Sequence, residues 1–555
     1  MKSSQERHAV EWPVGLSPAA SIDAPLQDEG PWIVAINGVP KARVSADVAA
    51  VLNAVDGEKT PAQVALHLGK PWTAADVLGI VRQLAHTRIF DDGARLGEES
   101  RVQFRAPLTI QFTLFNPSPF LQSLRPAVAA LARPATLAPL VLLLLGGLVG
   151  AVLAGPNIGR VLASPLPVEA YLFVLGAMFV STLLHELGHG MALSYFGGTP
   201  RRIGIMLFYL SPAFFCDVTD GWRLGSRKQR VIVALAGPLV HVGLGSIAMA
   251  TQGLLPDSSM KDAAVLYGVI CYAVAILNLF PFIKLDGYVA LMSAVDIPHL
   301  RKKSLDSLAD VVGSGLLGSR RSVRSPRPLP WFGLASFAAG IGFMLLGYQR
   351  LVPIFLQFGL VGHAVVLMIL CLLVFVAVRA TVRFFRSAAT NGSPAWRRGL
   401  VILFGALALA ALLSAIPVKA VTVAGFTHIN GELHVVVPLQ GADDPLRPGD
   451  QVTLQSQGMI IHQNLGRATI RDQPPSTSLA PLAAVLPIAL EENNLPVVAY
   501  AATGEGGPNL PPAGRAEVVG QRQTSLGEWL WNTATNSPLW PPQSGQTTDS
   551  TKGHP

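Results

Sequence analysis

The sequence predicts a polytopic α-helical membrane protein with about seven spans, a small N-terminal domain and a C-terminal β domain. Half of its 555 residues are hydrophobic and only 14% are charged, against roughly 25% in soluble domains. Seven apolar stretches are long enough to cross a bilayer, for which about 20 residues suffice. The net charge of +8 comes from lysines and arginines in the loops between these stretches. That pattern is typical of membrane proteins and makes nucleic acid an unlikely partner.

The N-terminal region is polar and predicts two parts. Residues 1–30 are charged, rich in proline and without a signal-peptide pattern, so we expect them to be disordered and cytoplasmic. Residues 31–98 predict a compact domain. It begins with a strand at 32–36, and three helices follow, with Ser45, Thr60 and Thr73 as their N-caps.

The domain at 31–98 resembles the small winged-helix domains of the PqqD type. The resemblance is carried by Val44-Ser45-Ala46-Asp47-Val48-Ala49 with Asp56-Gly57, by Thr60-Pro61-Ala62-Gln63-Val64, and by Leu84 to Phe90. Such domains bind the leader peptides of ribosomally made, post-translationally modified peptides. The resemblance therefore implies a winged-helix fold and capture of a leader peptide, with a generic packing role as the alternative.

The membrane region is predicted at 136–417, and its charges predict an orientation. The seven spans are 136–154, 169–196, 231–255, 263–283, 331–349, 354–378 and 399–417. With the N-terminus inside, the cytoplasmic loops 197–230, 284–330 and 379–398 carry six, eight and five Lys/Arg. The opposite loops carry only Arg160, Lys261 and Arg350. Because basic residues favour the cytoplasmic side, we expect this orientation in the cell membrane.

Residues 418–540 then predict an extracytoplasmic β domain. The stretches 421–424, 433–437 and 451–454 alternate like strands and are separated by Gly, Asp and Pro turns. Residues 541–555 predict a disordered tail. Cys216, Cys271 and Cys371 are the only cysteines, and all lie in or beside apolar segments. We expect them to be small core residues rather than disulfide partners or zinc ligands.

An HExxH motif lies inside the second span, at Leu183-Leu184-His185-Glu186-Leu187-Gly188-His189. On a helix, His185 and His189 lie one turn apart on the same face, so both imidazoles can reach one zinc ion. Glu186 lies about 100° round the helix, close enough to take a proton from water at that ion. Ionisable groups in hydrocarbon are costly and are usually functional. The motif therefore predicts peptide hydrolysis within the bilayer or at its edge.

A hydrolytic zinc ion needs a third protein ligand, and Asp286 is the natural candidate. It follows the fourth span, which returns to the side of the membrane where the HExxH helix ends. Asp217 and Asp220 are alternatives, although turn or surface roles suit them better. His241 and His363 are expected to pack within their spans, and His241 could also assist at the site.

The pair of motifs resembles the site-2 protease family of intramembrane zinc metallopeptidases. His185-Glu186-Leu187-Gly188-His189 and Asn278-Leu279-Phe280-Pro281-Phe282-Ile283-Lys284-Leu285-Asp286-Gly287 carry this resemblance over residues 169–295. Residues Pro212 to Arg223 and Ala236-Gly237-Pro238 look like its bacterial branch of peptide zinc metalloproteases. The resemblance implies that His185, His189 and Asp286 bind zinc and that Glu186 is the catalytic base and acid. It also implies that Asn278 orients substrate or holds the broken helix.

These observations predict an intramembrane zinc metalloprotease that cleaves the leader of a ribosomally made, modified peptide. A first alternative is cleavage of a membrane-anchored regulator or a signal-peptide remnant. A second is a non-catalytic component of peptide export or immunity. The expected partners are a peptide or membrane-anchored protein substrate, the lipid bilayer, and other peptide-maturation or export proteins. A re-entrant hairpin within 199–224 could present an edge strand to an extended substrate, or the same segment could be a structural plug.

Overall fold

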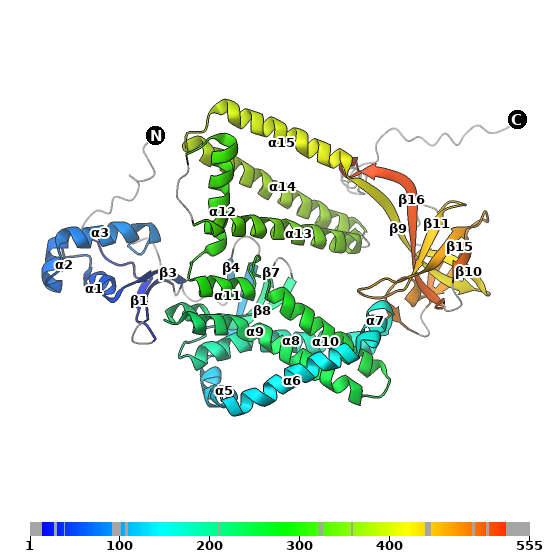
Figure 1. Ribbon diagram of the computed structural model, residues 1–555, viewed down its shortest axis with the longest axis horizontal. Helices are drawn as coiled ribbons and strands as arrows, with labels where there is room; N and C mark the ends of the chain where they lie inside the picture. The colour runs from blue at the N-terminus through cyan, green and yellow to red at the C-terminus, as the bar shows by residue number, and fades with distance from the viewer. Residues whose placement is uncertain are drawn as a thin grey trace. The chain divides into compact units, whose positions relative to one another are not determined.

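The computed structural model contains two compact units (Figure 1). The first comprises Met1–Gly155 and Leu172–Pro298, and the second comprises Pro156–Tyr171 and His299–Pro555. The predicted tail at 541–555 lies outside the described residues. The described residues are 14–26, 30–37, 39–90, 102–105, 109–208, 211–320, 326–356, 359–438, 446–490, 494–506 and 510–528.

The first unit begins with a small domain in which three helices follow an antiparallel sheet of order β1-β2-β3. Ser45, Thr60 and Thr73 cap the three helices as predicted, and the last two form full capping boxes. Val34 and Leu52 are fully buried between sheet and helices. The elements are β1 (Ala20–Asp23), β2 (Trp32–Ile36), β3 (Val39–Val44), α1 (Ala46–Ala54), α2 (Pro61–Leu68) and α3 (Ala74–Leu84).

Two features of this domain differ from the sequence analysis or go beyond it. Part of the segment predicted to be disordered is ordered, because β1 pairs with β2 and Val14 is buried among the helices. Prolines and charges around this short strand hid its alternating pattern. The order of three strands followed by three helices does not establish a winged-helix fold, so this assignment stays a prediction.

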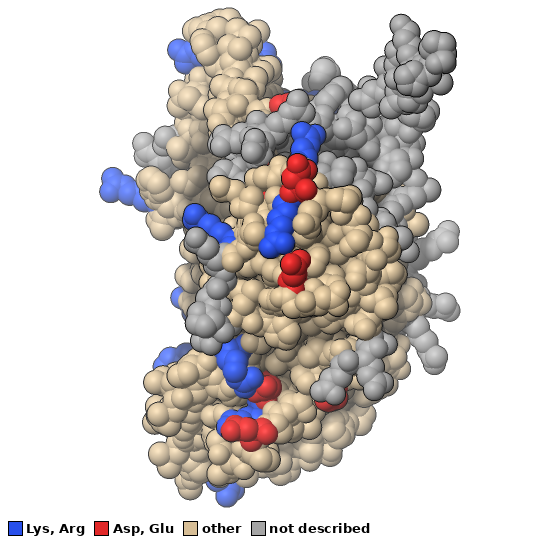
Figure 2. All heavy atoms as spheres, turned by 90° about the vertical axis from the view of Figure 1, so that its right-hand side faces the viewer, with Lys and Arg blue, Asp and Glu red and all other residues tan. Residues whose placement is uncertain are grey.

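Seven helices in the described part of the chain are long and apolar enough to cross a membrane, which confirms the predicted number. Many of their large apolar side chains are exposed, as lipid-facing residues would be. In Figure 2, Lys and Arg (blue) and Asp and Glu (red) form small scattered groups among other residues. The sixth helix runs to Thr390, beyond the predicted end at 378, because the helix continues through basic residues. The seven are α6 (Pro134–Leu153), α8 (Val168–Tyr195), α9 (Arg227–Thr251), α10 (Ser259–Asn278), α13 (Pro328–Leu356), α14 (Gly359–Thr390) and α15 (Ala395–Ala415).

A four-stranded antiparallel sheet of order β4-β5-β7-β8 joins two distant parts of the first unit. Its strands are β4 (Val102–Arg105), β5 (Thr109–Phe115), β7 (Ile203–Phe208) and β8 (Ser211–Cys216). The hairpin of β7 and β8 was predicted between the second and third spans, whereas β4 and β5 were not predicted. β8 lies at one edge of the sheet, next to the HExxH helix α8.

The second unit contains the C-terminal β domain, which is a six-stranded closed barrel. The ring runs β10-β9-β16-β11-β12-β15, and β15 pairs back to β10. Phe426, Val435 and Leu454 are fully buried in its core. The ring strands are β9 (Pro417–Ile429), β10 (Glu432–Pro438), β11 (Gln451–Gln455), β12 (Asn464–Ile470), β15 (Asn494–Gly506) and β16 (Ala513–Ser525), with β13 (Ser476–Pro481) added to β15.

Candidate metal centre

The structure brings the three predicted ligands together. The Nε2 atoms of His185 and His189 lie 3.2 Å apart. The carboxylate of Asp286 lies 3.1 Å from Nε2 of His185 and 3.4 Å from Nε2 of His189. Tetrahedral zinc with ligands about 2.05 Å away separates neighbouring ligand atoms by roughly 3.3 Å. The three donors therefore have the spacing that a single zinc ion requires.

The hydrogen bonding of His189 determines which of its ring nitrogens faces the other two predicted ligands. Its Nδ1 lies 2.7 Å from the carbonyl oxygen of Val233 on α9, so Nδ1 carries the proton and donates it. Nε2 of the neutral ring is then a lone pair that faces Nε2 of His185 and the carboxylate of Asp286. Both histidines are buried, at 6% exposure each. Acceptor atoms that converge in a buried place suit a cation, such as a metal ion, between them.

Two glycines allow the helices around this group to approach closely. A Cβ atom on Gly188 of α8 would lie 3.1 Å from the carbonyl oxygen of Ala236 on α9. A Cβ atom on Gly237 of α9 would lie 2.3 Å from Nε2 of His189 and 2.6 Å from Nε2 of His185. Gly237 therefore borders the metal position itself. The sequence analysis noted Gly237 only as part of a resemblance, because periodicity does not show which glycine faces a ligand.

Asp286 reaches the group through a turn after α10. The helix α10 ends at Asn278, and α11 (Asp286–Val295) begins at the aspartate. A Cβ atom on Gly287 would lie 2.1 Å from the carbonyl oxygen of Leu279, so only glycine fits there. The Leu-Asp-Gly sequence thus closes the turn tightly and directs Asp286 back toward α8. Asn278 lies at the start of the turn, as the predicted role of holding the broken helix requires.

Glu186 is held by the edge of the four-stranded sheet. Its Oε2 accepts a hydrogen bond of 2.9 Å from the backbone N–H of Cys216 at the end of β8. Burial, followed by the charges of Glu186 and Asp217, raises the pKa of the Cys216 thiol to about 12. The thiol therefore stays protonated at neutral pH, as expected of a core residue. Sequence reasoning missed this backbone contact, because any residue type can supply it.

The alternative third ligands have other partners. Asp217 forms an ion pair of 2.7 Å with Arg202 and accepts hydrogen bonds from Thr219. Burial would raise the pKa of Asp217, but the bonds from Thr219 and Arg202 hold it below its usual value. Asp220 is buried and accepts a hydrogen bond from the backbone N–H of Thr199. Both aspartates fix the loop after β8 and lie outside the metal-ligating group.

The two other histidines differ in their surroundings. His241 on α9 is buried, and its ring centroid lies 5.1 Å from that of His185. It is therefore a direct neighbour of the metal group, consistent with the predicted packing and with an assisting role. His363 lies on α14 in the second unit and is not a member of the group.

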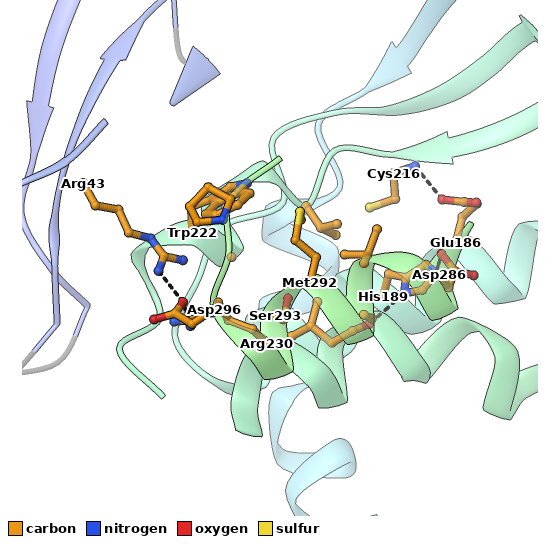
Figure 3. Close-up of a pocket in the computed structure, with 16 residues that line it drawn as sticks. Arg43, Glu186, His189, Cys216, Trp222, Arg230, Asp286, Met292, Ser293 and Asp296 are labelled. Atoms are coloured by element: carbon orange, nitrogen blue, oxygen red, sulfur yellow. Dashed lines mark hydrogen bonds and ion pairs between the residues drawn. The ribbon is translucent and has the colours of Figure 1, made fainter. Parts of the chain in front are cut away.

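A cavity of about 210 Å³ opens beside the metal group. Glu186, His189 and Asp286 line one end of it, and Arg43, Trp222, Arg230 and Asp296 line the other (Figure 3). Arg43 belongs to β3 of the N-terminal domain, so this domain forms part of the cavity wall. The sequence analysis did not predict this contribution, because 253 residues separate Arg43 from its partner Asp296.

Three arginines surround the carboxylate of Asp296. Arg43 Nη1 lies 2.9 Å, Arg230 Nη2 2.7 Å and Arg227 Nε 3.6 Å from it. Burial would raise the pKa of Asp296, but the hydrogen bond from Arg43 and the charges of Arg230 and Arg227 hold it below its usual value. Arg43 also stacks over the ring of Trp222, with its guanidinium carbon 4.8 Å from the ring centroid.

Comparisons with known proteins identify distant relatives over part of the chain. One is YydH of Bacillus subtilis, named as a candidate peptide zinc metalloprotease, which is 26% identical over 131 residues. This match covers 23% of the chain and 50% of YydH. Another is Rip2 of Mycobacterium tuberculosis, named as a candidate zinc metalloprotease, which is 29% identical over 165 residues. That match covers 25% of the chain and 61% of Rip2.

The chain thus spans about half to three fifths of the length of these relatives. No protein-family model and no solved structure matches it. The similarity to two proteins named for zinc proteolysis agrees with the grouping of His185, His189 and Asp286.

Proposed function

We propose that the protein is an intramembrane zinc metalloprotease of the site-2 type. The observation that carries the proposal is the group of His185, His189 and Asp286, of which His189 and Asp286 line a cavity together with Glu186. Three of these four residues lie near the end of the apolar helix α8, and Asp286 follows the end of α10. The partial homology to YydH and Rip2 supports the same activity.

Each polar group has a role in this proposal. His185, His189 and Asp286 would hold zinc, which when bound polarises a peptide carbonyl and lowers the pKa of water to roughly 7. Glu186 would take a proton from the attacking water and deliver one to the leaving amine. The N–H of Cys216 would keep the carboxylate of Glu186 in place. Asn278 would hold the turn that carries Asp286 or orient the substrate.

The outer edge of β8, which has no further strand beside it in the sheet order of the described residues, is the proposed binding place for the scissile segment. A substrate helix has to unwind before cleavage, because its carbonyls are engaged in i to i−4 hydrogen bonds. An extended segment could then pair with β8, as peptides add to sheet edges in other proteins. The N–H of Cys216 already points from this edge to Glu186, so a paired substrate would lie beside the proposed base.

The charge pattern of the loops supports a cytoplasmic N-terminus. The loops 197–230 and 284–330 flank the ends of α8 and α10 near the metal group and contain six and eight Lys/Arg. Basic loops favour the cytoplasmic side. We therefore propose that the metal centre opens toward the cytoplasm and that the C-terminal barrel is extracytoplasmic.

Zinc content of the purified full-length protein tests the site. We expect about one zinc ion per chain in the unaltered protein, because three ligands and one open position define a catalytic site. Asp286→Ala should lose the ion, whereas Asp217→Asn should retain it as a matched control on a carboxylate outside the group. Absence of zinc from the unaltered protein would instead favour the non-catalytic export component.

The proposed substrate is a ribosomally made peptide whose leader is captured by the N-terminal domain. The resemblance of residues 31–98 to PqqD-type domains and the naming of YydH as a peptide zinc metalloprotease both favour a peptide substrate. Cleavage of a membrane-anchored regulator or signal-peptide remnant remains the alternative. A precursor-peptide gene beside this gene favours the first substrate, and an anti-sigma-factor gene favours the second.

A binding titration tests leader capture. The full-length Glu186→Gln protein would be titrated with the precursor peptide encoded beside its gene, followed by fluorescence anisotropy. We expect saturable binding that disappears when the leader is removed from the peptide, because the leader is the part that the N-terminal domain recognises. Equal binding with and without the leader would contradict capture and leave the protease assignment untouched.

A further inference from the structure

The helix α11 forms a wall that connects the metal group to the arginines at the other end of the cavity. The cavity is lined by Asp286 and by the residues three, seven and ten positions after it, which are Val289, Ser293 and Asp296. This spacing places them on one face of the helix. Asp286 begins the helix and Asp296 caps its end. Ten residues at 1.5 Å each separate the two carboxylates by about 15 Å along the helix axis.

The far end of the cavity has more positive than negative charge. Arg43, Arg227 and Arg230 all pair with the single carboxylate of Asp296. Arg43 and Arg230 line the cavity, whereas Arg227 is 60% exposed in its side chain and does not line it. One carboxylate balances one of the three positive charges, so the local excess is two.

Several guanidinium N–H groups at this end have no partner. The side chain of Arg230 is 6% exposed, and its Nε atom is buried without a hydrogen bond. Nε and Nη2 of Arg43 are likewise buried and without a hydrogen bond. Buried charged donors left unsatisfied are costly, and a carboxylate with two oxygens is their natural acceptor. Asp296 accepts from Nη1 of Arg43 and Nη2 of Arg230, and the carbonyl oxygen of Leu224 accepts from Nη1 of Arg230. Three buried donors of the two arginines therefore remain without an acceptor among the described residues.

We propose that Arg43 and Arg230 form a specificity site for an acidic side chain of the substrate. The inference rests on the proposed proteolysis, because it places the acidic residue relative to the scissile bond. An extended peptide rises about 3.3 Å per residue, so a distance of about 15 Å corresponds to roughly four residues. A Glu or Asp about four residues from the cleaved bond would reach both guanidinium groups.

The N-terminal domain then has a second role at the site. Arg43 comes from β3, and Arg223 donates a hydrogen bond of 2.9 Å to the carbonyl oxygen of Ala24 just after β1. These contacts hold the domain against the loop that contains Trp222. The N-terminal domain thus completes the specificity site. Selection of the cleaved sequence therefore depends on contact between this domain and the loop that contains Trp222.

Peptide hydroxamates test the site without requiring cleavage. Two series carry the zinc-chelating hydroxamate at the C-terminal or the N-terminal end, with Glu or Gln placed three, four or five residues away. Their affinities for the full-length, zinc-loaded protein in detergent are measured by calorimetry. In one series, we expect the Glu peptide to bind about tenfold more tightly than the Gln peptide. A charge-assisted hydrogen bond contributes enough free energy for a difference of this size.

Variants separate the site from a general effect of charge. Arg43→Gln should bring the Glu-to-Gln affinity ratio close to one. Arg227→Gln, which removes the same charge from the same carboxylate but outside the cavity, should keep the ratio. Equal affinities at every spacing, or equal losses in both variants, would overturn the specificity site alone. Failure of every hydroxamate to bind the zinc-loaded protein would overturn the proposed function and this inference with it.

Discussion

Glu186→Gln is expected to leave zinc content unchanged and to lower the rate of peptide cleavage by about a hundred- to ten-thousandfold. The amide is nearly the same size and keeps an oxygen that can accept the hydrogen bond from Cys216 N–H. It cannot take a proton from water at neutral pH. The rate is measured in proteoliposomes by mass spectrometry of a synthetic transmembrane peptide that the unaltered protein cleaves, with zinc measured on the same preparation.

The control for this variant is Glu169→Gln. Glu169 lies in the first turn of the same helix and is not part of the cavity lining. The Glu169→Gln substitution removes one negative charge from α8, as Glu186→Gln does. The cleavage rate of this variant should match that of the unaltered protein. A Glu186→Gln protein that retained more than about a tenth of the cleavage rate would exclude Glu186 as the proton-transferring residue. General acid–base catalysis accelerates a reaction by at least about a hundredfold.

Gly237→Ala is expected to abolish zinc binding. The added methyl group would lie 2.3 Å from Nε2 of His189 and 2.6 Å from Nε2 of His185, where the metal ion and its ligand atoms must fit. Neither imidazole can move away easily, because Nδ1 of His189 donates a hydrogen bond to the carbonyl oxygen of Val233 and both rings are buried. Zinc per chain, measured by mass spectrometry of the purified protein, should fall below a tenth of the unaltered value.

Gly243→Ala is the matched control for this change. Gly243 lies on the same helix, and a Cβ atom there would meet nothing within 4 Å. The Gly243→Ala substitution changes helix propensity in the same way. The variant should therefore retain zinc and elute from a size-exclusion column like the unaltered protein. Full zinc content in Gly237→Ala would show that the ligands bind the ion from a different side than the structure indicates.

Local patterns in the sequence predicted much of the fold. Apolar runs of about 20 residues are set by hydrophobicity alone, so the seven long helices were predictable. Ser45, Thr60 and Thr73 were predictable as caps because an N-cap depends on residues within one turn. His185, His189 and Asp286 were placed together by motif spacing and by the return of the chain after two apolar runs.

The features that were missed depend on distant partners. β4 and β5 are short and form their sheet only with β7. Closure of the barrel depends on pairing between β10 and β15, which no local pattern encodes. Arg43 was not singled out in the sequence, since its partners Asp296 and Trp222 lie far along the chain. Gly237 could be recognised only once the positions of both imidazoles were known.

The proton arrangement on His189 has a consequence for how the protein matures in a cell. Because Nδ1 of His189 donates to Val233 of α9, Nε2 is left to bind the proposed zinc ion together with His185 of α8 and Asp286 of α11, so the ion would join these helices. Because the ion binds the assembled state and not the separate helices, its supply adds directly to the stability of the folded chain. Newly inserted chains made during zinc starvation should therefore be cleared by membrane quality control. The cell would then match the amount of this protein to the metal available.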